Sequence, residues 1–367
     1  MLHKIPLMRL IRLSIPIFIF CILAACSLAA DEQMIGAKIY EHNGSYDLLF
    51  EAWNDLGINT GFCSQELISD QDFMRQARDH GISTYLIFPV FFNPEALAHS
   101  PDLAAIDRGG FAAVEEWVEF VCPSREEYRH EIVEKARQMV REHAPDGISI
   151  DFIRHFVYWE KVYPDRDPAS LPVSCFDSLC LDHFQHEAGI KIPPSLITVP
   201  DKAEWILLSH PEEWTQWRCE LITSMVEEIS RAVREEKPDI LVNIHLVPWS
   251  EKDFDGGRMR VAGQDVAALS KYADLLSPMT YAHMVKQPPP WVHSITEDIF
   301  LKTTLPVIPS IQVGRAYLDK EFGLAEFRET VEEALLAPSG GVILWSWERL
   351  IAEPEKVELF KEILEEY

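Results

Sequence analysis

The sequence predicts an α/β protein built as a single (β/α)8 TIM barrel, and three observations support this fold class. Short β-rich runs alternate with longer amphipathic segments from Ile35 to the end of the chain, and strand followed by helix, repeated, is typical of a parallel sheet. Eight β-rich runs can be distinguished, which is the number of strands in such a barrel. No G-x-G-x-x-G or Walker sequence follows the first run, although an open doubly wound sheet usually carries a glycine-rich phosphate loop there.

The expected elements follow in order along the chain. The strands are Ile35–Tyr40, Thr60–Cys63, Ser83–Phe88, Gly147–Phe152, Ile240–Leu246, Leu275–Thr280, Val307–Ile311 and Gly341–Trp345. The helices between and after them are Asp47–Leu56, Asp72–His80, Arg125–His143, Trp214–Glu236, Gln264–Tyr272, Glu326–Leu336 and Glu355–Glu366. Ser124 followed by Glu127 indicates a capping box at the start of the third helix, because each side chain can bond the other residue's backbone N–H.

Two long interruptions break the alternation. They span Phe92–Pro123, after the third expected strand, and His155–Glu213, after the fourth. Both follow the carboxyl ends of strands, and barrel enzymes build their active sites from the loops at that end. We therefore expect these two long loops to contribute to a site.

The first 25 residues have the order of a secretory signal. Three cations, Lys4, Arg9 and Arg12, occur there without an acid, and the apolar run Ile15–Ala25 follows. That run is too short to span a bilayer comfortably. The small residues directly before Cys26 favour cleavage by a lipoprotein signal peptidase, which would leave Cys26 as the lipidated N-terminus.

We therefore expect residues 1–25 to be a lipoprotein signal peptide, 26–34 a lipid-anchored linker and 35–367 the barrel domain. An uncleaved anchor, or an ordinary signal cut near Ala30, are the alternatives, and all three export the chain. The expected location is the bacterial cell envelope, in the periplasm or on the cell surface, with the lipid as the only membrane contact.

The chain is strongly acidic, with 33 Lys and Arg against 59 Asp and Glu and a net charge of −26. Without its first 25 residues the charge is about −29, so a nucleic-acid partner is not expected. No second apolar stretch reaches membrane length. The composition leaves the oligomeric state open.

Five cysteines follow Cys26, and the odd count does not define a complete disulfide framework. They are Cys63, Cys122, Cys175, Cys180 and Cys219. The C-x4-C pair Cys175 and Cys180 is close enough to form a disulfide or to share a metal, but it lacks the second ligand pair of a structural zinc site. We expect a loop staple or free thiols, with no metal and no cofactor.

The sharpest candidate for chemistry is Asp151, in the segment Asp146-Gly147-Ile148-Ser149-Ile150-Asp151-Phe152-Ile153-Arg154. Alternation along a strand places Asp151 on the inward face, near the carboxyl end. An unpaired buried carboxylate would cost several kcal/mol, so Asp151 either pairs with a cation such as Arg154 or lies in a substrate cleft. Asp146 precedes the strand, where a turn residue is expected.

The order of three segments resembles the strands of chitinase-like glycoside hydrolases. They are the strand ending in Asp151, Ser277-Pro278-Met279-Thr280-Tyr281 and Gly340-Gly341-Val342-Ile343-Leu344-Trp345. The chain looks closer still to glycoside-hydrolase-like bacterial TIM barrels with a DG-[IV]-x-x-D-x-x-R strand, which tend to carry a cysteine-bearing loop after strand four. The resemblance implies that Asp151 is a catalytic carboxylate and that Arg154 holds it or a sugar hydroxyl.

The sequence departs from the chitinase pattern D-x-x-D-x-D-x-E. Ser149 and Ile153 stand where the middle acid and the final Glu would be, so the substrate-assisted mechanism does not carry over. Glycoside hydrolysis generally needs two carboxylates. We expect the second to be Glu348, just beyond the last strand, with Glu41, Asp253 and Asp255 as weaker alternatives.

Aromatic residues gather where the expected strands end, and sugars present apolar C–H faces that pack on such rings. The expected substrate-binding residues are Tyr40, Arg154, His245, Trp249, Tyr281, Trp345 and Trp347. Most single rings at such positions belong to the core, and His245 is equally compatible with a core histidine. Tyr281 is placed to donate a hydrogen bond to an acetamido or ring oxygen.

Two functions compete on these observations. The first is a glycosidase acting on an extracellular or cell-envelope polysaccharide, with Asp151 as a catalytic carboxylate. The second is a catalytically inactive carbohydrate-binding TIM-barrel lipoprotein, because a barrel can keep its aromatic platform and lose its acid. A metal-dependent deacetylase would need a convergent His/Asp cluster that the sequence does not show.

Overall fold

The computed structural model describes residues 33–367. The predicted signal peptide and Cys26 lie outside the described residues. Residues Gln33–Tyr367 form one compact unit, and within it no helix is long and apolar enough to cross a membrane.

Eight parallel strands form the centre of this unit, as the sequence predicts. They are β1 (Met34–Ile39), β2 (Thr60–Cys63), β3 (Ser83–Pro89), β6 (Gly147–Asp151), β7 (Leu241–Leu246), β8 (Leu275–Pro278), β9 (Ser310–Gln312) and β10 (Gly341–Trp345). Their order in the sheet is β8-β7-β6-β3-β2-β1-β10-β9. Isolated parallel bridges, Leu276 with Val307 and Met279 with Ser310, bring β8 back to β9 and close the (β/α)8 barrel.

Strand β6 shows why the barrel interior can be polar while its outer layer is apolar. Ile148 and Ile150 belong to the large hydrophobic core. Ser149 points the other way, where its Oγ receives a hydrogen bond from Asn243 Nδ2 and lies 2.9 Å from His245 Nε2. The alternation of side chains therefore places the next odd-numbered residue, Asp151, on the inner face at the end of the strand.

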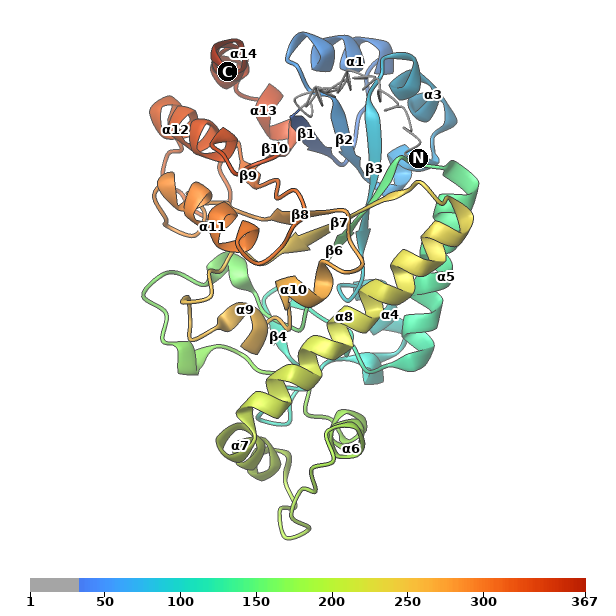
Figure 1. Cartoon of the computed structure of the whole chain (residues 1–367), viewed down its shortest axis with the longest axis vertical. Coiled ribbons are helices and arrows are strands. Elements are labelled where there is room, and N and C mark those ends of the chain that lie inside the picture. Colours follow the sequence, from blue (N-terminus) through green and yellow to red (C-terminus); the bar gives the residue numbers. More distant parts are fainter. Residues whose placement is uncertain (1–32) are drawn as a thin grey trace, which may run out of the picture. The chain divides into compact units, whose positions relative to one another are not determined.

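Helices cover the outside of the barrel (Figure 1). Those that alternate with the strands are α1 (Tyr46–Asp55), α3 (Gln71–Asp79), α5 (Glu126–His143), α8 (Pro211–Glu236), α10 (Val266–Leu269), α11 (Pro290–Phe300), α12 (Leu324–Leu335) and α14 (Pro354–Glu366). α5 and α8 run side by side (Figure 1), and Arg129 of α5 forms an ion pair of 2.6 Å with Glu228 of α8. α11 was not anticipated, and α10 is shorter than the expected Gln264–Tyr272.

The predicted capping box at the start of α5 is wrong. The residue before the helix is Arg125, and no side chain caps the first turn. Ser124 Oγ instead lies 3.2 Å from Cys180 Sγ, from which it accepts a hydrogen bond. Another partner therefore occupies the hydroxyl that the capping box needs.

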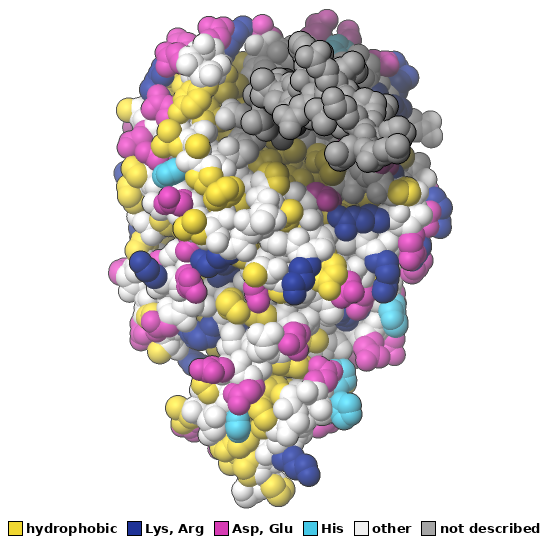
Figure 2. Space-filling view, viewed as in Figure 1, with side chains coloured by type: hydrophobic (Ala, Val, Ile, Leu, Met, Phe, Trp, Pro, Cys, Tyr) yellow, Lys and Arg dark blue, Asp and Glu magenta, His cyan; other side chains and the backbone are white. Residues whose placement is uncertain are grey.

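The two long loops contain elements of their own. The loop after β3 carries α4 (Pro94–His99) and an antiparallel hairpin of β4 (Val114–Glu115) and β5 (Val118–Glu119); the loop after β6 carries α6 (Ser178–Glu187) and α7 (Val199–Ser209). Short helices α2 (Gln65–Ser69), α9 (Gly257–Arg260) and α13 (Trp347–Ile351) complete the set, with 3-10 turns at Pro101–Leu103, Trp159–Lys161 and Pro168–Ser170. On the face drawn in Figure 2, acidic and basic side chains are interspersed.

Candidate active site

A small cavity of about 120 Å³ lies at the carboxyl end of the barrel strands. Its lining combines residues from β1, β6 and β10, from the two long loops, and from the segments that follow β1, β8 and β9. The lining residues are Lys38, Tyr40, Trp117, Asp151, Phe152, Arg154, Trp159, Glu160, Met279, Tyr281, Tyr317 and Trp345. The charged members are buried, whereas Tyr40, Trp117 and Tyr317 are exposed by 41%, 45% and 43%, so the cavity has a charged floor and an aromatic rim.

Asp151 lies on this floor as the last residue of β6, with 7% of its surface exposed. The backbone N–H of Phe152 donates a hydrogen bond of 2.7 Å to its Oδ1. Phe152 has a φ of 49°, a left-handed conformation in which the chain turns sharply away from the strand. Within residues 33–367 Asp151 forms no ion pair, so the structural pairing with Arg154 that the sequence allowed is not formed.

Several charges act on Asp151. Burial raises its pKa, but His245, Lys38, the Phe152 N–H and Arg154 outweigh that effect and leave the pKa below its usual value. Burial also lowers the pKa of His245 to about 3 and that of Lys38 to about 8. The imidazole is therefore neutral at pH 7, and the Lys38 ammonium, together with the Arg154 guanidinium, is the nearby positive charge that keeps Asp151 ionised.

Glu160 is the second carboxyl group of the cavity, and it behaves in the opposite way. It lies in the 3-10 turn Trp159–Lys161 of the loop after β6 and is 9% exposed. Burial raises its pKa to about 7, against the opposing attraction of Arg154. Its Oε2 is buried without a hydrogen-bond partner, and its Oε1 lies 4.0 Å from Arg154 Nη2. At neutral pH this carboxyl group therefore holds its proton about half of the time.

The positive charge of Arg154 interacts with both acids, Asp151 and Glu160. Burial lowers its pKa, and Glu160 and Asp151 both oppose that shift. Its guanidinium packs 4.8 Å from the ring centroid of Phe120 and 5.0 Å from that of Phe152, and its Nη2 donates to Val157 O at 3.3 Å. These contacts fix the cation beside both carboxyl groups without a direct salt bridge to Asp151.

Stacked rings form one wall of the cavity. Tyr281 and Trp345 lie with centroids 4.4 Å apart and planes at 15°, and Trp159 packs on Tyr281 at 5.7 Å. The Tyr281 hydroxyl accepts a hydrogen bond of 3.4 Å from Lys38 Nζ and lies 3.3 Å from Ser310 Oγ. Tyr281 and Trp345 were predicted from the sequence as site residues, and in the structure both line the same cavity as Asp151.

Four expected site residues do not line the cavity. Glu348 Oε1 accepts the backbone N–H groups of Tyr40 and Glu41 at 2.6 and 3.2 Å, which gives this carboxylate a structural partner. His245 lies deeper in the barrel beside Ser149. Trp249 and Trp347 are 3% and 5% exposed and pack in hydrophobic clusters. The weaker acid candidates Glu41, Asp253 and Asp255 also lie outside the lining.

Sequence reasoning missed two functional groups of the floor. Lys38 could have been found from the sequence. A lysine at an inward position of an apolar strand is costly to bury unless an acidic group lies close to it. No pattern in the sequence points to Glu160, because it lies in an irregular loop without periodicity. Its proximity to Asp151 is visible only in the folded chain.

The fold is shared with glycoside hydrolase barrels of known structure. The chain superposes on the glycoside hydrolase domain of PgaB (BpsB) from Bordetella bronchiseptica with a TM-score of 0.68 and 12% sequence identity, over 90% of this chain and 98% of that one. It also superposes on a β-galactosidase from the psychrophilic Marinomonas ef1 with a TM-score of 0.64 and 12% identity, over 91% of this chain and 59% of that one.

A β-galactosidase from the Antarctic haloarchaeon Halorubrum lacusprofundi matches with a TM-score of 0.62 and 14% identity, over 86% of this chain and 52% of that one. The chain thus spans between half and three fifths of the length of these galactosidases. No protein-family model matches the sequence, and no curated protein matches it either. At these identities the likeness defines the class of fold, a (β/α)8 barrel, and a shared fold does not by itself determine function.

Proposed function

We propose that this protein is a glycoside hydrolase that acts on an extracellular or cell-envelope polysaccharide, with Asp151 and Glu160 as its two catalytic carboxyl groups. One observation carries the proposal: two acids line one cavity, and their surroundings displace their pKa values in opposite directions. Such a divided pair supplies the acid and the base of glycoside hydrolysis. In this proposal Glu160, and not the predicted Glu348, is the second catalytic carboxyl group.

The roles follow from the protonation states. Glu160, neutral below about pH 7, gives its proton to the glycosidic oxygen as the C–O bond breaks. Asp151, ionised, either attacks the anomeric carbon or removes a proton from the attacking water. Lys38 keeps Asp151 ionised and, through Tyr281, is connected to the aromatic wall.

The size of the cavity bears on the substrate. At about 120 Å³ it is well below the roughly 300–1,000 Å³ of pockets that enclose drug-sized ligands. It therefore accommodates at most one sugar residue, with the stacked Tyr281 and Trp345 on one side and the exposed rings of Tyr40 and Trp117 at its entrance. This geometry supports action at the end of a saccharide chain.

The proposed location follows from the N-terminal sequence. Cleavage before Cys26 and lipidation of that residue would hold the acidic barrel at the surface of a bacterial membrane, in contact with envelope or extracellular polysaccharide. Metabolic labelling with a fatty-acid analogue tests this: the wild-type chain should be labelled, and a Cys26→Ala variant should not. Equal labelling of both would remove Cys26 as the lipidation site.

Sugar release from a panel of polysaccharides and aryl glycosides tests the hydrolase. Asp151→Asn should lower kcat/KM by about a thousandfold or more, because the ionised carboxylate is lost. Asp146→Asn is the matched control, since it makes the same change at the other end of β6. Equal rates for wild type and Asp151→Asn would remove Asp151 from the mechanism.

The same variants separate hydrolysis from binding alone. If no glycoside in the panel is cleaved by the wild type while a saccharide binds to it in calorimetry, the protein is the carbohydrate-binding barrel that the aromatic wall also supports. If Asp151→Asn still binds the saccharide that the wild type cleaves, Asp151 acts in the chemical step.

A further inference from the structure

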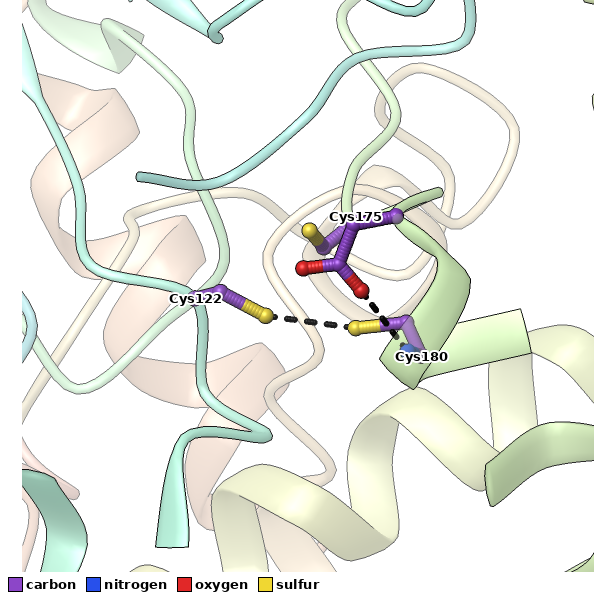
Figure 3. Close-up of side chains that lie close together, drawn as sticks. Cys122, Cys175 and Cys180 are labelled. Carbon is purple, nitrogen blue, oxygen red and sulfur yellow. Dashed lines mark hydrogen bonds between the residues drawn. The ribbon is translucent and has the colours of Figure 1, made fainter. Parts of the chain in front are cut away.

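A second cluster of reactive side chains lies outside the cavity. Cys122, from the loop after β3, lies beside Cys175, Asp177 and Cys180, which belong to the segment just before α6 and to the first turn of that helix. The thiol sulfurs and a carboxylate oxygen of these four residues all lie within 4.8 Å of one another, and the three cysteines are buried. Figure 3 shows the sulfur atoms of Cys122 and Cys180 pointing toward each other.

The distances in this cluster fit a shared ion better than a disulfide. Cys122 Sγ and Cys180 Sγ are 3.2 Å apart, whereas a disulfide bond is about 2.05 Å long. Two thiolates bound tetrahedrally at about 2.3 Å from zinc lie about 3.8 Å apart. A disulfide would also leave one of three clustered thiols without a partner, whereas an ion uses all of them.

The surroundings of the donors support metal binding. Cys175 Sγ accepts the backbone N–H of Ile106 at 3.0 Å, a bond that stabilises a thiolate. The Asp177 carboxylate accepts a hydrogen bond of 2.6 Å from Arg125 Nη2 and one of 2.7 Å from the backbone N–H of Cys180. Each carboxylate oxygen still has a free lone pair, and ligand carboxylates in metal sites are normally held by such outer partners.

Charge balance gives an independent argument. Three thiolates and one carboxylate around a divalent cation leave two negative charges. Arg125 offsets one of them directly. Arg218 is fully buried, donates only to the carbonyls of Arg260 and Val261, and has no acidic partner within the described part of the chain. Burial lowers the pKa of Arg218 to about 10, and Cys219, Cys175 and Cys180 oppose that shift, so the guanidinium lies close enough to feel charge in this cluster.

We propose that Cys122, Cys175 and Cys180 bind one structural zinc ion, with Asp177 as the fourth ligand. The thiol protons pass to solvent when the ion binds. The ion would join the loop after β3 to the loop after β6, which carry Trp117 and Glu160 into the cavity. Its role is to hold these loops in place, since four protein ligands leave no open position for catalysis.

Metal analysis of the full-length chain tests this inference. Protein produced with zinc in the medium should retain about one equivalent per chain. Cys219→Ser, which alters a buried cysteine outside the cluster, should retain as much as the wild type. Cys175→Ser and Cys122→Ser should retain far less. Equal zinc content in Cys175→Ser and wild type would overturn the assignment.

Cobalt titration of the wild type gives a readout that does not depend on the folding of variants. After removal of zinc under reducing conditions, Co²⁺ should produce thiolate-to-metal absorption and the visible bands of a tetrahedral site, saturating at about one equivalent. No such absorption from fully reduced protein would overturn the proposal. So would a Cys122–Cys180 disulfide in peptides from protein isolated from the cell envelope.

Discussion

The two ends of the barrel use their acidic residues differently. At the amino end, Asp146 accepts the backbone N–H and the hydroxyl of Thr84 at 2.8 and 3.2 Å. Asp274 similarly accepts the Val242 N–H and Arg234, both at 2.8 Å. At the carboxyl end, Asp151 receives one hydrogen bond, from its own neighbour Phe152, and the buried Glu160 Oε2 receives none.

The carboxyl end is where hydrogen-bonding capacity of the acids stays available to a ligand. The two acids at the amino end directly precede β6 and β8, and each accepts two hydrogen bonds from neighbouring elements, which stabilises the barrel. Acids at the carboxyl end have few hydrogen-bond partners and lie in a cavity. Desolvation there raises the free energy of their charged forms and makes them reactive. The same contrast between a stability face and a catalytic face is general for barrels of this type.

Glu160→Gln should have a large effect on the rate of catalysis, because it changes an acid at the carboxyl end. Loss of a general acid lowers the rate by about 10²–10⁴-fold for substrates whose leaving group needs a proton. Glycosides of dinitrophenol, which leaves without one, should be cleaved nearly as fast as by wild type. A uniform loss over both substrate types, measured as kcat/KM, would contradict the acid role.

Stability should depend on pH through the same residue. The pKa of Glu160 is raised in the folded protein, from 4.5 to about 7, so the folded state binds the extra proton and the wild type loses stability as pH rises from 4.5 to 7. Linkage gives a loss of roughly 3 kcal/mol. Glu160→Gln removes this loss. Denaturation should therefore show a higher unfolding free energy for the variant, relative to wild type, at pH 9 than at pH 4.

The pH profile of activity should have its alkaline limb near pH 7. Above the pKa of Glu160 the proton needed by the leaving group is gone, so kcat/KM falls about tenfold per pH unit. The acid limb lies below the ordinary range of aspartate, because the pKa of Asp151 is lowered. An alkaline limb that persists unchanged in Glu160→Gln would assign it to another group, with Lys38 the first to examine.

The smallest expected effect belongs to the amino end. Asp146→Asn weakens the bonds to Thr84 and should cost about 1–2 kcal/mol of unfolding free energy, measured by urea denaturation. Its kcat/KM should stay within about twofold of wild type, since Asp146 lies at the opposite end of β6. A large loss of activity in Asp146→Asn without loss of stability would contradict the separation of a stabilising amino end from a catalytic carboxyl end.

The sequence was sufficient for the barrel because each strand carries its own signal. Gly341–Trp345 and Thr60–Cys63 were predicted with the boundaries that the structure has, and the alternation through Ser149 and Asp151 gave the inward face. α11 was missed because a proline-rich start at Pro288–Pro290 hid its periodicity.

The candidate site was predicted only at and just after strand ends. Tyr40, Asp151, Arg154, Tyr281 and Trp345 lie there and line the cavity, and the strand pattern of the sequence could place them. Glu160 depends on the path of a long loop, which no local pattern encodes. Glu348 was expected beside Asp151, but the chain enters α13 and turns its carboxylate to the amides that follow β1.

The closure of the barrel has a consequence for its motion. Neighbouring strands elsewhere are joined over three to five residue pairs, for example β3 and β6 over five, but β8 and β9 meet only through the bridges Leu276–Val307 and Met279–Ser310. The amides along this seam, such as that of Ile308, should exchange with deuterium before those of β6. Because the Tyr281 hydroxyl reaches across the seam to Ser310, any local parting there loosens the aromatic wall first and leaves the charged floor in place.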